Sequence, residues 1–439
     1  MSPALALLVA AALGADARID TGIRAETRFR HLDPAPTPPE RNALDLTATP
    51  HLILGVTGGL GTLSATYAPR LTAADVGPDL RWEHMHEGEL RLRLAPGPTW
   101  NLEGFASGGI GRTDLITENR NAGAATGGGT GGTSTSTNTI ATLATVDLQR
   151  LRGGLALTLA PGRRTQAILS GAVSEDGGTT RLFRTVLPSA RSAEAGAELR
   201  WNATRLAQLG VRLAASTTHI ESRPQTDSNG NPVVGPTDSA WGSALATWRR
   251  RMDPQVEMWA GAGAVAMQSK VPTLSSDGVH TEHETQRRTA PAGELGIVRT
   301  ARTQEVATEQ ETPQEATASR PVRLRQDATG RLVAMLGGSV DRLTGVATPT
   351  LDVRGELRWP VSSSVAVVGQ GTGTLTWPSS GRTRRGQLEL GLARQLTPRA
   401  LIEIAGYGSW QNSDDPTVLD LSEYGAFLRL TLDARPITY

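Results

Sequence analysis

Apolar and polar residues alternate along most of this chain, and the period of the alternation is two. Between residues 19 and 29, nearly every second position is Ile, Thr, Ala or Phe, while Asp, Glu and Arg occupy most positions between them. The same alternation recurs around residues 44–56, 193–201, 351–359 and 424–432. Because successive side chains of a β-strand point to opposite faces, this pattern predicts strands with one apolar and one polar face.

The predicted strands are long, and the connections between them alternate in length. Apolar faces run for about ten residues or more, the length of a strand that crosses a membrane, whereas soluble strands average about five or six residues. Short turns are predicted at 95–99, 160–165, 202–206, 251–255, 360–364 and 395–399, and long polar loops at 31–42, 113–138, 175–190, 221–239, 268–287 and 411–420. Short turns at one end and long loops at the other are typical of transmembrane β-barrels.

Most tryptophans are predicted to lie near strand ends. Indole rings prefer the interface between lipid and water, so two rings of tryptophan would mark the edges of an apolar band. The predicted girdle consists of Trp82, Trp100, Trp201, Trp241, Trp248, Trp359, Trp377 and Trp410. Trp259 falls in the middle of a predicted strand and is the exception.

The alternation accounts for about 18 strands, with 16 as the alternative, and both numbers are even, as this class of closed antiparallel barrel requires. Residues 300–320 are rich in Gln, Glu and Thr and lack an apolar face, so they are predicted as a polar loop, a lumen-facing segment or an irregular strand extension. A strand is expected to resume near Val322 or Leu332. Gly, Thr and Ser dominate residues 121–138, which predicts a flexible surface loop.

Composition narrows the class of protein further. Of 439 residues, 38% are hydrophobic and 4% aromatic, which is lean for soluble cores of this size but sufficient for a thin outer band. The net charge is +1, from 44 basic and 43 acidic residues, which argues against a nucleic-acid partner. The sequence contains no cysteine, so disulfides, zinc–thiolate sites and a thiolate nucleophile are excluded.

The N-terminal residues have the pattern of a signal peptide. An apolar stretch covers residues 4–13, and Ala15 and Ala17 form an A-x-A cleavage pattern. We therefore divide the chain into a signal peptide, residues 1–17, and a barrel, residues 18–439. No later run reaches the roughly 20 apolar residues of a membrane helix. An exported chain that crosses a membrane without helices is expected to form a closed barrel.

The C-terminal residues add to this picture. Apolar and polar residues alternate from Tyr424 to Leu432, and Tyr439 is a terminal aromatic residue. With this ending, the mature chain resembles bacterial outer-membrane β-barrels such as porins, although no motif identifies a narrower family. Pro436 departs from the pattern because proline interrupts a strand.

That resemblance carries expectations about location and partners. It implies that the protein lies in the bacterial outer membrane, in contact with outer-membrane lipid and lipopolysaccharide. It also implies insertion by the barrel-assembly machinery, which reads the last strand of such barrels. A barrel that exports a polymer would in addition need a periplasmic export partner.

Few residues suggest chemistry. His84 and His86 share one face of a predicted strand at a spacing that suits a metal ion, and His280 and His283 form a second pair. Both pairs fall in or beside predicted outer loops, where solvated histidines are the simpler interpretation. The sequence shows no catalytic constellation and no cofactor motif, so we predict neither an enzyme nor a bound metal or cofactor.

The polar faces of the predicted strands would line the interior. The candidate pore-lining residues are Arg24, Arg28, Glu198, Arg200, Arg212, Asp352, Arg354, Glu356, Arg358, Glu389, Glu403 and Arg429. A mixture of both signs suits a water-filled path, and it equally suits ion pairs that hold the shape of the barrel.

A barrel of about 16 to 18 strands leaves an aqueous channel. We therefore predict an outer-membrane pore or translocation channel for hydrophilic solutes, with export of a polysaccharide as a narrower hypothesis. One alternative is a structural or adhesive outer-membrane protein with a plugged barrel. A second is an enzyme with its active site at the barrel rim.

Overall fold

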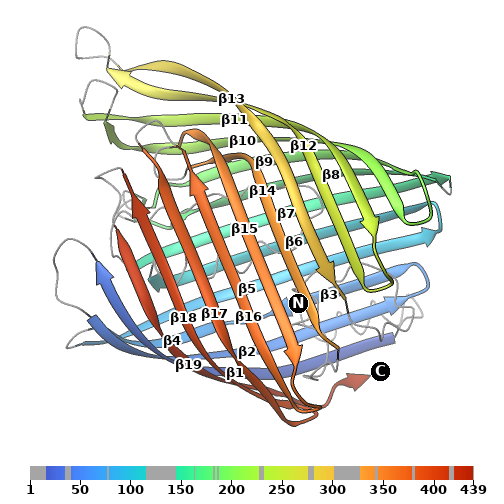
Figure 1. Cartoon of the computed structure of the whole chain (residues 1–439). Coiled ribbons are helices and arrows are strands. Elements are labelled where there is room, and N and C mark those ends of the chain that lie inside the picture. Colours follow the sequence, from blue (N-terminus) through green and yellow to red (C-terminus); the bar gives the residue numbers. More distant parts are fainter. Residues whose placement is uncertain are drawn as a thin grey trace.

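The structure, a computed structural model, consists of one β-sheet that wraps around a central space (Figure 1). It describes residues 16–34, 41–76, 79–114, 145–162, 164–180, 183–184, 187–226, 232–274, 281–300, 327–341, 345–377, 381–414 and 420–438. Among these residues, no helix has the length and apolar character needed to span a membrane.

The sheet closes on itself. Its strands are β1 (Asp16–Pro34), β2 (Arg41–Gly58), β3 (Gly61–Tyr67), β4 (Arg70–Val76), β5 (Asp79–Gly97), β6 (Trp100–Asp114), β7 (Thr145–Gly162), β8 (Thr165–Gly178), β9 (Ala190–Asn202), β10 (Ala207–Thr226), β11 (Pro232–Arg251), β12 (Val256–Leu274), β13 (Thr281–Arg299), β14 (Thr329–Val340), β15 (Ala347–Pro360), β16 (Val365–Thr376), β17 (Thr383–Thr397), β18 (Ala400–Ser413), β19 (Leu421–Asp433) and β20 (Ile437–Thr438). Neighbours along the chain pair antiparallel, and β1 pairs with β19. Closure leaves no open edge between the first and last strands of the wall.

The described strands fill 18 positions in the wall, as predicted. β3 and β4 share one position, because both lie between β2 and β5 and only Ala68 and Pro69 separate them. β20 is a short addition that pairs with the beginning of β1.

The two faces of the wall differ in the way that the alternation predicts. On β8, β9 and β10, Leu169, Leu199 and Val211 are 49%, 54% and 52% exposed on the outer face. Glu198 and Arg200, which flank Leu199 in sequence, are 8% and 7% exposed on the inner face. Large apolar side chains that are half-exposed around a closed barrel form a band suited to lipid.

The ends of the barrel differ in the length of their connections. All six predicted short turns are present at one end, for example between β9 and β10 and between β15 and β16. The predicted loops at 221–239 and 268–287 are wrong in extent, because β10 to β13 continue as paired strands to Thr226, Pro232, Leu274 and Thr281. A hairpin satisfies its backbone hydrogen bonds even where both faces meet water, so these strands continue beyond the apolar alternation.

Several predictions concern residues that lie wholly or partly outside the described part of the chain. These are the signal peptide, the loop at 121–138, most of 300–320 and a strand start near Val322. Leu332, the alternative start, lies in β14. Asp16 and Ala17 form the start of β1, and the division of the chain at residue 17 stays a prediction.

Because alternate residues of a strand face lipid and the lumen, arginine substitutions at two neighbouring residues of β8 should affect the free energy of unfolding differently. Leu169→Arg places a charge in the lipid-facing band and should lower the free energy of unfolding by about 2–4 kcal/mol. Ser170→Arg, one residue further on and facing the lumen, should change it little. Urea titrations of both variants in lipid vesicles measure the difference, and equal losses would contradict the assignment of faces.

Candidate functional site

All twelve charged residues predicted to line a pore project to the inner face of the wall. Each of them either neighbours an outward apolar residue in sequence or pairs in register with an inward-facing residue of the next strand. Glu356 and Arg358, for example, flank the exposed Leu357, and Arg212 pairs with Glu198. The structure brings eight of the twelve into two ion-pair networks, while the other four lie together on β15. Their role in lining a transport path stays a prediction.

The first network joins β1 to β17, β18 and β19. The Glu26 carboxylate accepts from Arg28 at 2.8 Å and from Arg429 at 2.8 Å, and Arg24 lies 3.5 Å away. Arg429 also donates to Glu403 at 2.9 Å. Each guanidinium can bond several oxygens at once, so one carboxylate and its neighbours link the two ends of the closed sheet.

Aromatic rings extend this network. The guanidinium carbon of Arg28 lies 4.3 Å from the ring centre of Tyr407 and 4.9 Å from that of Phe427. The Tyr407 hydroxyl donates to Glu423 at 3.0 Å. Glu389 accepts from Gln370 at 2.5 Å and lies 4.0 Å from Arg28. The network is therefore held by stacking as well as by charge.

The second network lies across β9, β10 and β13. Arg200 donates twice to Glu198, at 2.7 and 3.0 Å, and Arg212 lies 3.4 Å from the same carboxylate. Arg212 also donates to Glu294 at 2.5 Å. β10 is the ninth wall position and β19 the eighteenth when β3 and β4 count as one, so the two networks line opposite sides of the barrel.

The four charged residues of β15 have separate neighbours. Asp352 accepts a hydrogen bond from Thr374 of β16 at 2.7 Å. Arg354, Glu356 and Arg358 continue the same inward row toward the short-turn end. This part of the wall thus alternates in sign along a single strand.

Sequence reasoning omitted several inward residues that prove central. Glu26 and Glu294 complete the two networks, and Arg30 forms a buried ion pair with Asp45 of β2 at 3.1 Å. Glu26 and Arg30 lie an even number of residues from Arg24 and Arg28. The alternation of the sequence therefore already placed them on the same face of the strand. Glu294 could be linked to Arg212 only through the three-dimensional arrangement, because the two lie on strands that are not neighbours.

A hairpin at the end with the long connections departs from the wall and enters the lumen. Pairing between β13 and β14 stops at Gly293 and Leu336, while pairing between β12 and β13 continues to Thr281. Beyond that point the end of β14 and the start of β15 pair with each other, residue 337 to residue 350. They cross the inner faces of β11 and β12, which are not their sequence neighbours.

Hydrogen bonds fix the hairpin on the inner wall. Ser239 of β11 donates to the Gly345 carbonyl at 2.5 Å, and the Ala347 amide donates to Ser269 of β12 at 2.8 Å. Within the hairpin, the Ser339 and Thr350 hydroxyls lie 2.5 Å apart. These polar groups are buried, so their pairing removes the cost of burying them.

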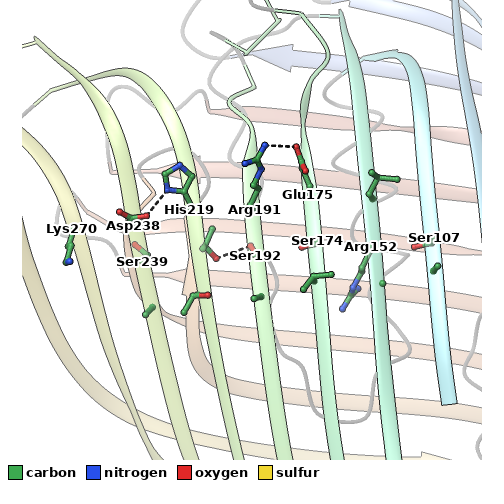
Figure 2. A pocket seen from close by; sticks show the side chains of 18 of the residues that line it. Ser107, Arg152, Ser174, Glu175, Arg191, Ser192, His219, Asp238, Ser239 and Lys270 are labelled. Atoms are coloured by element: carbon green, nitrogen blue, oxygen red, sulfur yellow. Dashed lines mark hydrogen bonds and ion pairs between the residues drawn. The ribbon is translucent and has the colours of Figure 1, made fainter. Parts of the chain in front are cut away.

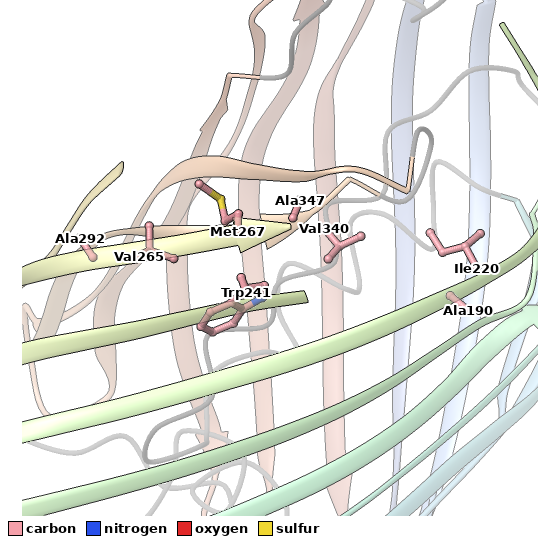
Figure 3. Packing of buried hydrophobic residues seen from close by; sticks show 8 residues of the cluster. All are labelled: Ala190, Ile220, Trp241, Val265, Met267, Ala292, Val340 and Ala347. Atoms are coloured by element: carbon pink, nitrogen blue, oxygen red, sulfur yellow. The ribbon is translucent and has the colours of Figure 1, made fainter. Parts of the chain in front are cut away.

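Apolar packing accompanies these bonds. A buried cluster joins the wall to the hairpin, with Trp241, Val265 and Met267 against Val340 and Ala347 (Figure 3). Gly338 permits the approach, since a Cβ there would lie 3.0 Å from the Val265 side chain. Gly345 has φ +72°, in the left-handed region that favours glycine, at the tip of the hairpin.

The inward hairpin leaves part of β13 with a partner on one side only. In the described part of the chain, residues 281–292 pair with β12 and with no other strand. Pro291 lies two residues beyond the last pair with β14, and Arg287 is exposed nearby. Proline and charged side chains are the usual residues of a free edge, because they oppose further pairing.

Seven of the eight tryptophans lie at positions that remain compatible with the predicted girdle near the strand ends. Trp82, Trp100, Trp201, Trp248, Trp359 and Trp410 are exposed, and Trp377 directly follows β16. Trp241 differs: it is 4% exposed and faces inward, beneath the hairpin. The predicted place near a strand end is wrong, because Trp241 lies in the middle of β11. It is seven residues from the exposed Trp248, so the alternation of the sequence already placed it on the opposite, inner face. Trp259 also faces inward, beneath Arg249 at 5.8 Å.

The three described histidines of the two pairs lie on strands. His84 and His86 belong to β5, with ring centres 6.0 Å apart, and His86 bonds the Tyr67 hydroxyl at 2.8 Å. His283 belongs to β13, and His280 lies outside the described residues. Within the described residues, no group of three or more potential ligands could hold a metal ion.

Comparisons with known proteins give structural similarity alone. No protein-family model and no curated protein matches the chain. Among solved structures, the ferric citrate transporter FecA in unliganded form is 14% identical, with a TM-score of 0.44, over 90% of this chain and 60% of its own. The ferric yersiniabactin uptake receptor FyuA from Yersinia pestis is 12% identical, with a TM-score of 0.43, over 94% and 80%. OccK5 (OpdH) from Pseudomonas aeruginosa is 10% identical, with a TM-score of 0.38, over 95% and 98%.

The chain thus spans about 60% of the length of the first of these proteins. Its own structure carries the assignment of class. Eighteen antiparallel wall positions close into a ring, an apolar band with exposed tryptophans surrounds it, and paired charges cover the interior. Closed sheets of this construction cross the outer membranes of bacteria. The protein is an outer-membrane β-barrel.

Proposed function

We propose that this barrel is a channel for small hydrophilic solutes, narrowed by the β14–β15 hairpin. The observation that carries the proposal is the inner face, where ionised side chains pair around the circumference. A lumen lined in this way favours water over a dry apolar filling, because unpaired charges in a dry interior would lose their hydration. A barrel of 18 strands is wide enough to hold such an aqueous path.

Charge balance sets the expected selectivity. The first network combines Arg24, Arg28 and Arg429 with Glu26, Glu389 and Glu403, and the second combines Arg200 and Arg212 with Glu198 and Glu294. Each network holds equal numbers of positive and negative groups. We infer a pore with little preference for the sign of the ion, because neither of these two networks holds an excess of one sign.

The hairpin bears on the size of the solute. It occupies part of the lumen on the side of β11 and β12, so the open channel is narrower than the ring of strands. A polymer such as an exported polysaccharide would need the hairpin to move aside and would need a periplasmic export partner. The narrower proposal is therefore passage of small solutes, and insertion of the barrel is proposed to use the barrel-assembly machinery.

Bilayer recording tests conduction and charge selectivity together. The wild-type protein should form channels with weak ion selectivity. Arg354→Glu combined with Arg358→Glu should shift the reversal potential toward cation preference, because it replaces two inward positive charges. The matched control is Arg250→Glu, an exposed arginine on the outer face of β11. A folded wild-type protein that never conducts would contradict the channel and favour a plugged barrel.

Shortening the hairpin tests its role as a constriction. Residues 338–349 would be replaced by a two-residue Asn-Gly turn, which suits an antiparallel hairpin. The single-channel conductance should rise severalfold, because the segment that enters the lumen is removed. Replacing residues 271–284 at the tip of the β12–β13 hairpin in the same way should leave conductance almost unchanged. Equal effects of the two deletions would contradict the assignment.

A crosslink tests the position of the hairpin independently of conduction. The chain has no cysteine, so an introduced pair can react only with itself. Ser269→Cys with Ala347→Cys should form a disulfide on mild oxidation, because these residues are joined by a 2.8 Å hydrogen bond. Lys270→Cys with Ala347→Cys should not, since Lys270 faces outward. Failure of the first pair to close in folded protein would contradict the inward hairpin.

A further inference from the structure

The β14–β15 hairpin has withdrawn from a place in the wall that two neighbouring strands still border. On one side, the pairing of β13 with β14 stops at Gly293. On the other side, β15 keeps its alignment with the end of β16, where the Trp377 amide donates to the Pro349 carbonyl at 3.2 Å. Arg288 of β13 reaches across this place and donates to the Trp377 carbonyl at 3.2 Å.

The sequence of the hairpin continues the alternation of a wall strand. Leu332 of β14 and Leu357 of β15 are exposed on the outer face. The hairpin residues at an even distance from these leucines are apolar, namely Gly338, Val340, Ala347 and Pro349. The residues between them are polar, namely Ser339, Asp341, Thr348 and Thr350. The hairpin is therefore suited to a place in the wall, with its apolar residues outward and its polar residues toward the lumen.

The register of β13 and β14 also extends into the hairpin. Continued beyond its last pair, it would place Val340 beside Thr289 and Asp341 beside Arg288. An arginine opposite an aspartate stabilises a pair of antiparallel strands. The backbone groups of β13 that lack a strand partner would gain one in the same step. The unpaired edge of β13 thus matches the hairpin in register and in charge.

Contacts in the lumen favour the position that the hairpin occupies here. Ser239, which Figure 2 shows next to Asp238 on β11, donates to the Gly345 carbonyl. Val340 is buried in one cluster with Trp241 (Figure 3). Against these contacts, the Thr348 hydroxyl is buried and has no hydrogen-bond partner within the described residues, which is unfavourable.

Glycines mark the point at which the hairpin leaves the wall. In the continued register, Gly337 and Gly338 would lie opposite Ala292 and Pro291. Glycine and proline both weaken strand pairing, so this seam opens more easily than one of β-branched residues. A Cβ at position 338 would lie 3.0 Å from the Val265 side chain, whereas a Cβ at position 337 would meet nothing within 4 Å.

We propose that the β14–β15 hairpin is a gate with two positions. In the lumen position, which the structure shows, it narrows the channel. In the wall position, residues 337–341 pair with β13 and the hairpin leaves the lumen, so the channel widens. The movement of the hairpin is independent of conduction, while its effect on pore width rests on the proposed channel.

Disulfide trapping of the full chain, in vesicles that hold one chain each, detects the wall position. The diagnostic pair is Thr289→Cys with Val340→Cys. Thr289 is exposed on the outer face of β13, and Val340 is buried on the lumen side, so the two cysteines meet only when the hairpin enters the wall. The diagnostic pair should close partially and slowly, because the wall position is the minor one.

The control is a second pair on the outer face of the same seam. Ile297→Cys with Leu332→Cys joins two exposed residues that are in register between β13 and β14. This control pair should close fully in either position of the hairpin. Its closure also shows that a variant has folded.

Two glycine variants shift the gate in the background of the diagnostic pair. Gly338→Val crowds Val265 in the lumen position and faces lipid in the wall position, so the diagnostic pair should close at least about threefold faster. Gly337→Val makes the same change of residue in open space and should leave the rate unchanged. No closure of the diagnostic pair in Gly338→Val while the control pair closes, or equal rates in the two glycine variants, would overturn the two positions.

Bilayer recording separates the gate from the channel. Oxidation of the diagnostic pair should raise the single-channel conductance severalfold, whereas oxidation of Ser269→Cys with Ala347→Cys should hold it at the low level. If the diagnostic pair closes and no variant conducts, the proposed channel fails and the movement of the hairpin stands. If conductance is the same before and after the diagnostic pair closes, the gate is wrong and the channel stands.

Discussion

Backbone hydrogen bonding is the constraint on which the rest of this structure depends. Peptide groups in hydrocarbon have no water to bond, so a sheet that crosses a membrane pairs its strands on both sides. In the described part of the chain, residues 281–292 of β13 depart from this rule, because they pair with β12 alone. Here β1 and β19 meet from Gly22–Asp433 to Pro34–Leu421 and close the ring. In a wall one strand thick, alternate residues of the same strand face lipid and the lumen. This requirement accounts for the period of two in the alternation of apolar and polar residues.

The inner face shows the consequence of that alternation. Charged side chains that point inward have less bulk water around them than they would on the surface of a soluble sheet. They are therefore stabilised by pairing with side chains of opposite charge. Arg212 bridges Glu198 and Glu294 across strands that are not neighbours, and Arg429 bridges Glu26 and Glu403 at the closure. The same pairs that satisfy the charges also brace the ring, which makes structural support and pore lining two aspects of one arrangement.

The sequence predicts features that repeat and misses features that occur once. Alternation and turn residues were sufficient for the class, the strand number and the short turns, because each strand repeats the same pattern. The inward hairpin depends on single contacts, such as Gly338 against Val265 and Ser269 against Ala347, which leave no periodic signal. Trp241 was misassigned although its parity, opposite to that of the exposed Trp248, is inward. The hairpin explains why an indole packs at that inward position.

Water access along one strand tests the central claim most directly. Because the chain has no cysteine, single cysteines can be placed at Glu194, Ala195, Gly196 and Ala197 of β9 and exposed to a water-soluble maleimide in lipid vesicles. The structure predicts fast reaction at 194 and 196, which face the lumen, and protection at 195 and 197, which face lipid. Equal reaction rates at Ala195→Cys and Gly196→Cys would contradict a barrel with a hydrated interior and a lipid-facing exterior.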